Sequence, residues 1–85
     1  MNKQDPRYEI FRSSLKELRK NKNITQQELA DRLRRPQSFV SKLESGERNI
    51  DMIELFDVIV ALGAKPEVAI LELLKTIDTS PQKIK

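Results

Sequence analysis

The sequence predicts an all-α domain of five short helices. In each of five segments, apolar residues recur every three or four positions, which is the spacing of one face of an α-helix. Each segment also opens on a capping residue or a proline, and two of them close on glycine. No segment shows a convincing β-strand pattern. We therefore take the helices in order.

The first helix is predicted over residues 6–21. Asp5 and Pro6 form a cap followed by proline at the first helical position. Phe11, Leu15 and Leu18 then share one apolar face. The opposite face carries four cations: Arg12, Lys16, Arg19 and Lys20. Asparagines and a lysine at 21–23 end the helix with turn-forming residues.

The second helix has the clearest start signal. Thr25 and Glu28 form a capping box, in which each side chain can bond the backbone N–H of the other residue. Ile24 and Leu29 are placed for a hydrophobic contact across the cap. The predicted buried stripe contains Leu29, Ala30 and Leu33, and the helix ends near residue 33 or 34.

The third helix is predicted from Pro36 to residue 44 or 45. Val40 and Leu43 face the core, Phe39 covers its rim, and Gly46 takes the left-handed position after the end. The two flanking helices leave only three or four residues for the turn before it. This close pairing of short helices is typical of a helix-turn-helix.

The fourth and fifth helices complete the predicted domain. Asp51 and Glu54 repeat the cap pattern for a helix that runs to Leu62 and closes at Gly63. Its expected core residues are Met52, Leu55, Ile59 and Leu62. The fifth helix is predicted from Pro66 to about residue 76. One domain over residues 6–78 is expected, with flexible tails at 1–5 and 79–85.

Charge and composition limit the classes of function that we expect for this chain. Residues 1–50 hold 12 Lys/Arg and 7 Asp/Glu, a net +5, whereas residues 51–85 hold 4 and 6, a net −2. A basic half suits a polyanionic partner, although ordinary solvated charge explains the asymmetry equally well. The chain has no His, no Cys and only two glycines, both expected at helix ends, so we expect no enzyme, no metal site and no cofactor. We also expect a cytoplasmic protein with no membrane span and no small-molecule ligand.

The outward face of the third helix carries side chains that suit DNA bases. With Val40 and Leu43 on the core, the outward positions are Gln37, Ser38, Ser41 and Lys42. Glutamine can pair with both N6 and N7 of adenine, lysine can donate to guanine, and serine suits either base. Taken singly, the two serines are as easily explained as solvated surface residues.

These residues resemble a known family. TQQELADRL, SFVSKLESGERN and IVALG, within residues 15–63, are similar to the lambda-repressor-like (Cro/repressor, xenobiotic-response-element) helix-turn-helix family. The resemblance implies a five-helix DNA-binding domain that works as a dimer on a palindromic operator. It implies a phosphate contact and a bracing role for Gln26, and backbone contacts for Arg48 and Asn49. It also implies that Gln37, Ser38, Ser41 and Lys42 line the major groove, with a phosphate contact equally open for Lys42.

The turn departs from the family pattern. Arg34 stands where the family usually has glycine, Arg35 where it has an apolar residue, and Pro36 where it has a Ser/Thr cap. A left-handed Arg34 would cost on the order of 1 kcal/mol. We favour a different local turn geometry with a solvated Arg34. For Arg35, a phosphate contact and simple solvation remain equally open.

Helices four and five are apolar around much of their circumference. The fourth has a second stripe of Ile53, Phe56 and Val60. The fifth buries one face with Ile70, Leu73, Leu74 and Ile77. We expect these seven residues to form a two-fold homodimer interface. The alternative is that the fifth helix folds back onto the second stripe within one chain.

The predicted function is a sequence-specific regulator of transcription, most simply a dimeric repressor that binds double-stranded DNA. The alternative is an antitoxin-like or other protein-interaction module that binds a partner protein through the fifth helix. What the apolar surface binds distinguishes the two.

Overall fold

The structure is a computed structural model, and it describes residues 5–78. This part of the chain forms five helices. They are α1 (Pro6–Asn21), α2 (Gln26–Leu33), α3 (Gln37–Ser45), α4 (Met52–Ala61) and α5 (Pro66–Asp78). The all-α prediction is confirmed, and residues 5–78 contain no strand. Apart from Asp5, the predicted tails lie outside these residues. No helix formed by the described residues has the length and apolar content to cross a membrane.

The helix ends follow the predicted capping chemistry. The Thr25 hydroxyl accepts from the Glu28 N–H at 3.0 Å, and the Glu28 carboxylate accepts from the Thr25 N–H at 2.8 Å. Asp51 and Glu54 make the same reciprocal pair at the start of α4. Asp5 caps α1 by accepting from the N–H of Arg7. Both capping boxes and the α1 cap are thus confirmed, and each satisfies backbone N–H groups that a helix start leaves open.

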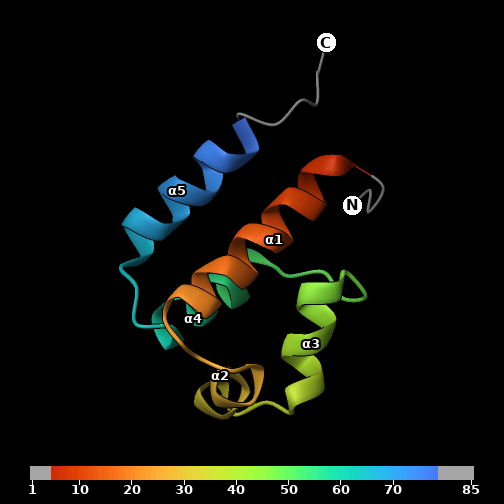
Figure 1. The fold of residues 1–85 in the computed structure, drawn as a ribbon, viewed down its shortest axis with the longest axis vertical. Coiled ribbons are helices and arrows are strands. Elements are labelled where there is room, and N and C mark those ends of the chain that lie inside the picture. The colour runs from red at the N-terminus through yellow and green to blue at the C-terminus, as the bar shows by residue number, and fades with distance from the viewer. Residues whose placement is uncertain (1–4, 79–85) are drawn as a thin grey trace.

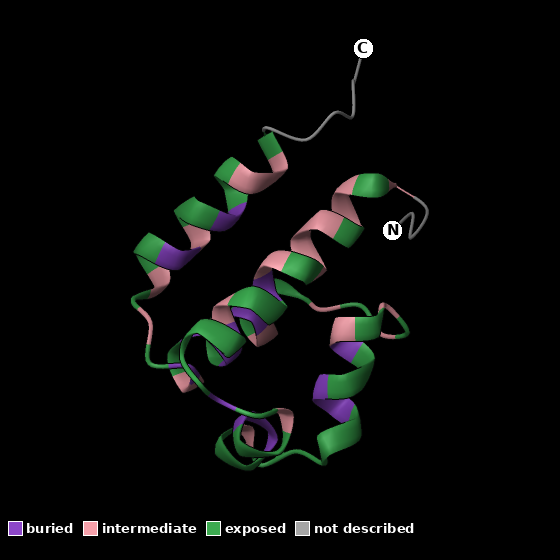
Figure 2. Cartoon of the chain, in the orientation of Figure 1, coloured by how far each residue is buried: buried purple, intermediate pink, exposed green. Residues whose placement is uncertain are grey.

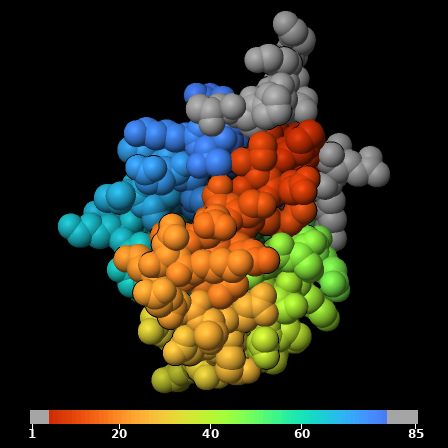
Figure 3. Space-filling view, in the orientation of Figure 1, coloured from red at the N-terminus to blue at the C-terminus, as the bar shows by residue number. Residues whose placement is uncertain are grey.

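α1 packs against α3 and α5. Figure 1 shows α5 lying along one side of α1 and running in the opposite direction, and α2 lying beyond the C-terminal end of α1. The space-filling view shows α1 filling the seam between α5 and α3 (Figure 3). α4 packs against both α2 and α5. The predicted alternative in which α5 covers Ile53, Phe56 and Val60 is wrong, because α5 lies along α1 and leaves all three exposed.

The core is built from one face of each helix (Figure 2). Its most deeply buried large side chains are Val40, Val58, Ile59 and Leu62. Burial of a side chain of this size contributes about 1.5–3 kcal/mol. Leu29, Ala30, Leu43 and Leu55 are buried as predicted. Met52 is not: it lies at the first position of α4 and is 63% exposed, which corrects its assignment to the core.

The last turns of α4 and α3 are closed in different ways. Nη1 of Arg32, on α2, donates to the carbonyl of Ala61 at 2.8 Å and so satisfies a carbonyl in the last turn of α4. Gly46 ends α3 with φ +89°, in the left-handed region that favours glycine. A Cβ at Gly46 would also lie 2.7 Å from the guanidinium carbon of Arg12.

Candidate nucleic-acid interface

The outward face of α3 is polar and exposed. Phe39, Val40 and Leu43 are buried, and Figure 2 shows exposed residues on the opposite edge of the helix. The exposed side chains include Gln37, Ser38, Ser41 and Lys42. The structure thus places the four predicted base-reading residues together on one open surface.

The connection between α2 and α3 is tight. Ala30 is fully buried where the two helices pack together, which agrees with the need for a small side chain there. Arg34 has φ 58° and ψ 43°, so it does adopt the left-handed conformation. The expectation of a different turn geometry is therefore wrong. The N–H of Arg35 donates to the Ala30 carbonyl at 2.9 Å and closes the end of α2 around this strained residue.

A buried ion pair joins α1 to α3. Arg19 donates from Nε and Nη2 to the two carboxylate oxygens of Glu44, at 2.7 and 3.0 Å, and from Nη1 to the carbonyl of Ile24 at 2.8 Å. The sequence pattern placed Arg19 opposite the apolar stripe of the first helix, but only 7% of the residue is exposed. The pattern missed it because a long cationic side chain is buried only when a distant acceptor pairs with it.

Gln26 connects this ion pair to the exposed face of α3. Its Nε2 donates to Glu44 at 2.9 Å, and its Oε1 accepts from Nε2 of Gln37 at 3.3 Å. Gln26 is the first residue of α2 and Gln37 the first of α3. The structure therefore shows the bracing role that the resemblance implied for Gln26.

Two arginines flank the ring of Phe39. The guanidinium carbons of Arg35 and Arg48 lie 4.4 and 4.6 Å from its centroid, within the range of cation–π attraction. Phe39 is only 7% exposed, so its expected place at the rim is corrected to the core. Nη1 of Arg48 also donates to the backbone carbonyl of Asn49. Asn49 is exposed.

Glu54 neutralises part of this cluster. Its carboxylate accepts two hydrogen bonds from Arg48, at 2.9 and 2.8 Å, and lies 3.9 Å from Arg35. These bonds, with the capping N–H of Asp51, hold the pKa of Glu54 at about 2. Glu54 was predicted only as a capping residue, because the sequence spacing alone does not reveal its contacts with the two arginines.

The apolar surface of α4 and α5 is divided between solvent and core. Four of the predicted interface residues are exposed: Ile53, Phe56, Val60 and Leu74. Ile70 and Ile77 are half-buried. Leu73 is only 6% exposed and belongs to the core, so its assignment to a dimer interface is wrong. α5 packs on α1 of the same chain, and Leu73 belongs to the hydrophobic core.

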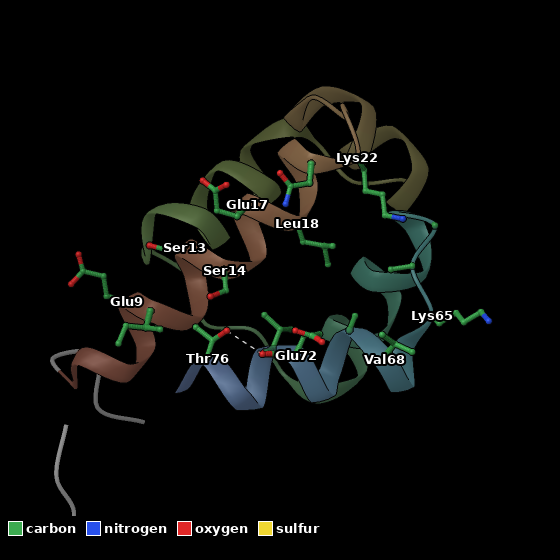
Figure 4. Close-up of a pocket in the computed structure, with 16 residues that line it drawn as sticks. Glu9, Ser13, Ser14, Glu17, Leu18, Lys22, Lys65, Val68, Glu72 and Thr76 are labelled. Carbon is green, nitrogen blue, oxygen red and sulfur yellow. Dashed lines mark hydrogen bonds between the residues drawn. The ribbon is translucent and has the colours of Figure 1, made fainter. Parts of the chain in front are cut away.

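A groove of about 1020 Å³ runs between α1 and α5 and contains no residue from α2 or α3. Figure 4 shows Leu18 and Val68 facing one another across it. Lys22 and Lys65 lie toward one end, and Glu9 lies toward the other. The groove is therefore separate from the polar face of α3.

The fold and the polar face of α3 together define a DNA-binding helix-turn-helix protein. The family model described as Helix-turn-helix matches residues 15–68, so the chain belongs to this family. It is a regulator of transcription of the Cro/repressor, xenobiotic-response-element type.

Two similar proteins support this assignment. The chain is 36% identical over 69 residues to the uncharacterized HTH-type transcriptional regulator y4dJ of Sinorhizobium fredii, covering 81% of this chain and 84% of that protein. It is also similar to the solved structure of an XRE-family like protein from Pseudomonas syringae pv. tomato, with a TM-score of 0.76 and 44% identity. That similarity covers 82% of this chain and 85% of the solved chain.

Proposed function

We propose that the protein is a dimeric repressor that inserts α3 into the major groove of a palindromic operator. The observation that carries this proposal is the set of four exposed polar side chains on a helix whose other face is buried. A helix anchored in this way can approach base edges without rearranging the core. It acts by binding DNA, without catalysis, in the cytoplasm and on the nucleoid.

The side chains divide into base readers and backbone binders. Gln37 can read adenine through its amide, and Ser38, Ser41 and Lys42 contact neighbouring bases. Backbone phosphates are bound by the remaining predicted residues, which come from the first turn of α2 and from both sides of α3: Gln26, Arg35, Arg48 and Asn49.

Dimerisation is proposed through the exposed apolar residues of α4 and α5. Ile53 is 71% exposed, Phe56 48%, Val60 50% and Leu74 56%, so a monomer would leave a large apolar area in water. Contact with a second copy would bury this area and give the protein the two-fold symmetry of a palindromic operator. Ile70 and Ile77 would lie at the edge of that contact.

Selection of duplexes from a random DNA pool, near physiological salt, tests the proposal. We expect an enriched inverted repeat with half-sites about one helical turn, or ~34 Å, apart. Enrichment of a single half-site would contradict the dimer but keep the DNA-reading role. Weak, salt-sensitive binding to all sequences would contradict sequence-specific regulation.

A second candidate function is recognition of a partner protein through α5. Val68 and Leu71 are 53% and 52% exposed, and neither belongs to the set proposed for the homodimer. Co-purification of a stoichiometric partner whose binding is abolished by Leu71→Glu, with the homodimer intact, would support this function.

A further inference from the structure

Two arginines from opposite ends of α3 converge on Phe39. Arg35 precedes the helix and Arg48 follows it, yet both guanidinium groups lie over the same ring. Glu54 reaches both of them from the first turn of α4. The cluster contains two cations and one anion, so it keeps a surplus positive charge beside the helix that reads DNA.

The hydrogen bonds of Arg48 leave one edge of its guanidinium open. Nη1 and Nη2 donate to the two carboxylate oxygens of Glu54, and Nη1 also donates to the Asn49 carbonyl. A guanidinium has five N–H groups in one fixed plane. The remaining two, on Nε and on the outer side of Nη2, are adjacent and donate to no residue within 5–78. Two adjacent N–H groups form the fork that binds a phosphate through two oxygens.

We propose that Glu54 and Phe39 are positioning residues that hold Arg48 with its open edge toward one phosphate of the DNA backbone. Arg35 supplies a second cation to the same phosphate. The proposal rests on the DNA-binding function proposed above and deepens it by naming the groups that orient this arginine. An arginine already held at its end and on its face loses less rotamer freedom on binding than a free one.

Glu54→Gln separates orientation from charge. Glutamine can still complete the capping box of α4, because Glu and Gln both serve at this position. Loss of the carboxylate nevertheless releases Arg48 and adds one net positive charge. Asp57→Asn makes the same charge change at an exposed residue of the same helix and serves as the matched control.

Binding is measured by fluorescence anisotropy with the duplex enriched by selection and with a random duplex. We expect Glu54→Gln to weaken binding to both duplexes roughly tenfold, as for loss of a hydrogen bond to a charged group, because every duplex presents the same backbone phosphates. Asp57→Asn should tighten both slightly, because it only adds positive charge. Arg48→Lys should behave like Glu54→Gln, since lysine keeps the charge but lacks the fork.

The phosphate is located with enriched duplexes in which one backbone phosphate at a time is replaced by an uncharged methylphosphonate. One replacement in each half-site should weaken binding of the unmodified protein but not of Arg48→Ala. If no replacement shows this dependence on Arg48, the phosphate site is overturned.

Tighter binding by Glu54→Gln, equal to that of Asp57→Asn, would overturn the positioning role while leaving the DNA-binding function intact. If Glu54→Gln unfolds, Arg48→Lys decides the question, because it leaves Glu54 and the cap unchanged. Unaltered binding by Arg48→Lys would then overturn the fork. Failure of the unmodified protein to bind any duplex would overturn the proposed function and this site together.

Discussion

Arg19 and Glu44 form an ion pair that is buried on both sides, with 8% and 7% of the two side chains exposed. The pair joins residues 25 positions apart and holds the end of α3 against α1. Arg19 also binds the Ile24 carbonyl, and Glu44 also accepts from Gln26, so both groups have more than one hydrogen-bond partner. These additional hydrogen bonds offset the cost of removing the two charges from water.

Removal of one member of this pair should be severe. Glu44→Ala should lower the free energy of unfolding by about 3–5 kcal/mol, because it leaves the Arg19 charge buried without its partner. The double variant Arg19→Met with Glu44→Leu should lose less. Urea unfolding at neutral pH measures both, with Glu17→Ala, at an exposed carboxylate of α1, as the control. A Glu44→Ala loss as small as that of the control would contradict the burial.

Arg34→Gly should stabilise the protein. Arg34 is left-handed at φ 58°, a conformation that costs a residue with a side chain about 1 kcal/mol relative to glycine. The midpoint of thermal unfolding should therefore rise. Lys16→Gly, inside α1, provides the contrast and should destabilise by about 1 kcal/mol. A lower midpoint for Arg34→Gly would mean that the Arg34 side chain stabilises the turn.

Gln37→Ala should relax DNA specificity. If Gln37 reads a base, its loss should weaken binding to the enriched duplex by about 1–3 kcal/mol and remove the preference at one operator position. Random-duplex binding should change little. Gln27→Ala, at an exposed glutamine of α2, is the control. An equal loss on both duplexes would show that Gln37 contacts the backbone instead.

Phe56→Glu should dissociate the proposed dimer. Phe56 is 48% exposed, and a carboxylate in an apolar contact between two copies would be buried without a partner. Sedimentation at micromolar concentration should give about twice the chain mass of 9.9 kDa for the unmodified protein and the single-chain mass for the variant. Gln27→Glu should remain dimeric. An unmodified protein that sediments as a monomer would exclude the dimer at this concentration.

The pairing of Glu54 with Arg48 should make stability depend on pH. Hydrogen bonds from Arg48 lower the pKa of Glu54 from 4.5 to about 2, so the unfolded chain binds a proton at a higher pH than the folded one. The stabilising contribution is complete above the unfolded pKa and is lost as pH falls from about 4.5 toward 2. Unfolding of the unmodified protein and of Glu54→Gln at pH 7, 4 and 2.5 should show a shrinking difference in free energy. A constant difference would contradict the pairing.

Local signals were enough to predict the helices. The reciprocal bonds of Thr25 with Glu28 involve residues three positions apart, and the periodic placement of Leu29 and Val40 reports burial directly. The exposed face of α3 followed from the same periodicity, because its apolar positions left the polar ones outside. These features need no knowledge of how the helices are arranged.

Features that depend on tertiary contacts could not be predicted from the sequence. Periodicity gave no reason to pair Arg19 with Glu44, and it could not reveal that Glu54 joins Arg35 to Arg48. Leu73 was wrongly assigned to an interface, although it is buried in its own chain. The fifth helix is apolar on two faces, and its sequence pattern does not distinguish the face that packs on the same chain from the face that is exposed. The place of Leu73 was decided by α5 packing along α1.

The hydrogen bonds of Gln26 also carry a polarity. A guanidinium can only donate and an ionised carboxylate can only accept, so Glu44 turns the amide nitrogen of Gln26 inward and its oxygen toward Gln37. That oxygen in turn attracts the amide nitrogen of Gln37. An isolated glutamine could present either end of its amide to solvent with little preference. Here the buried pair of Arg19 and Glu44 orients the amide of Gln26, and Gln26 in turn orients the exposed amide of Gln37.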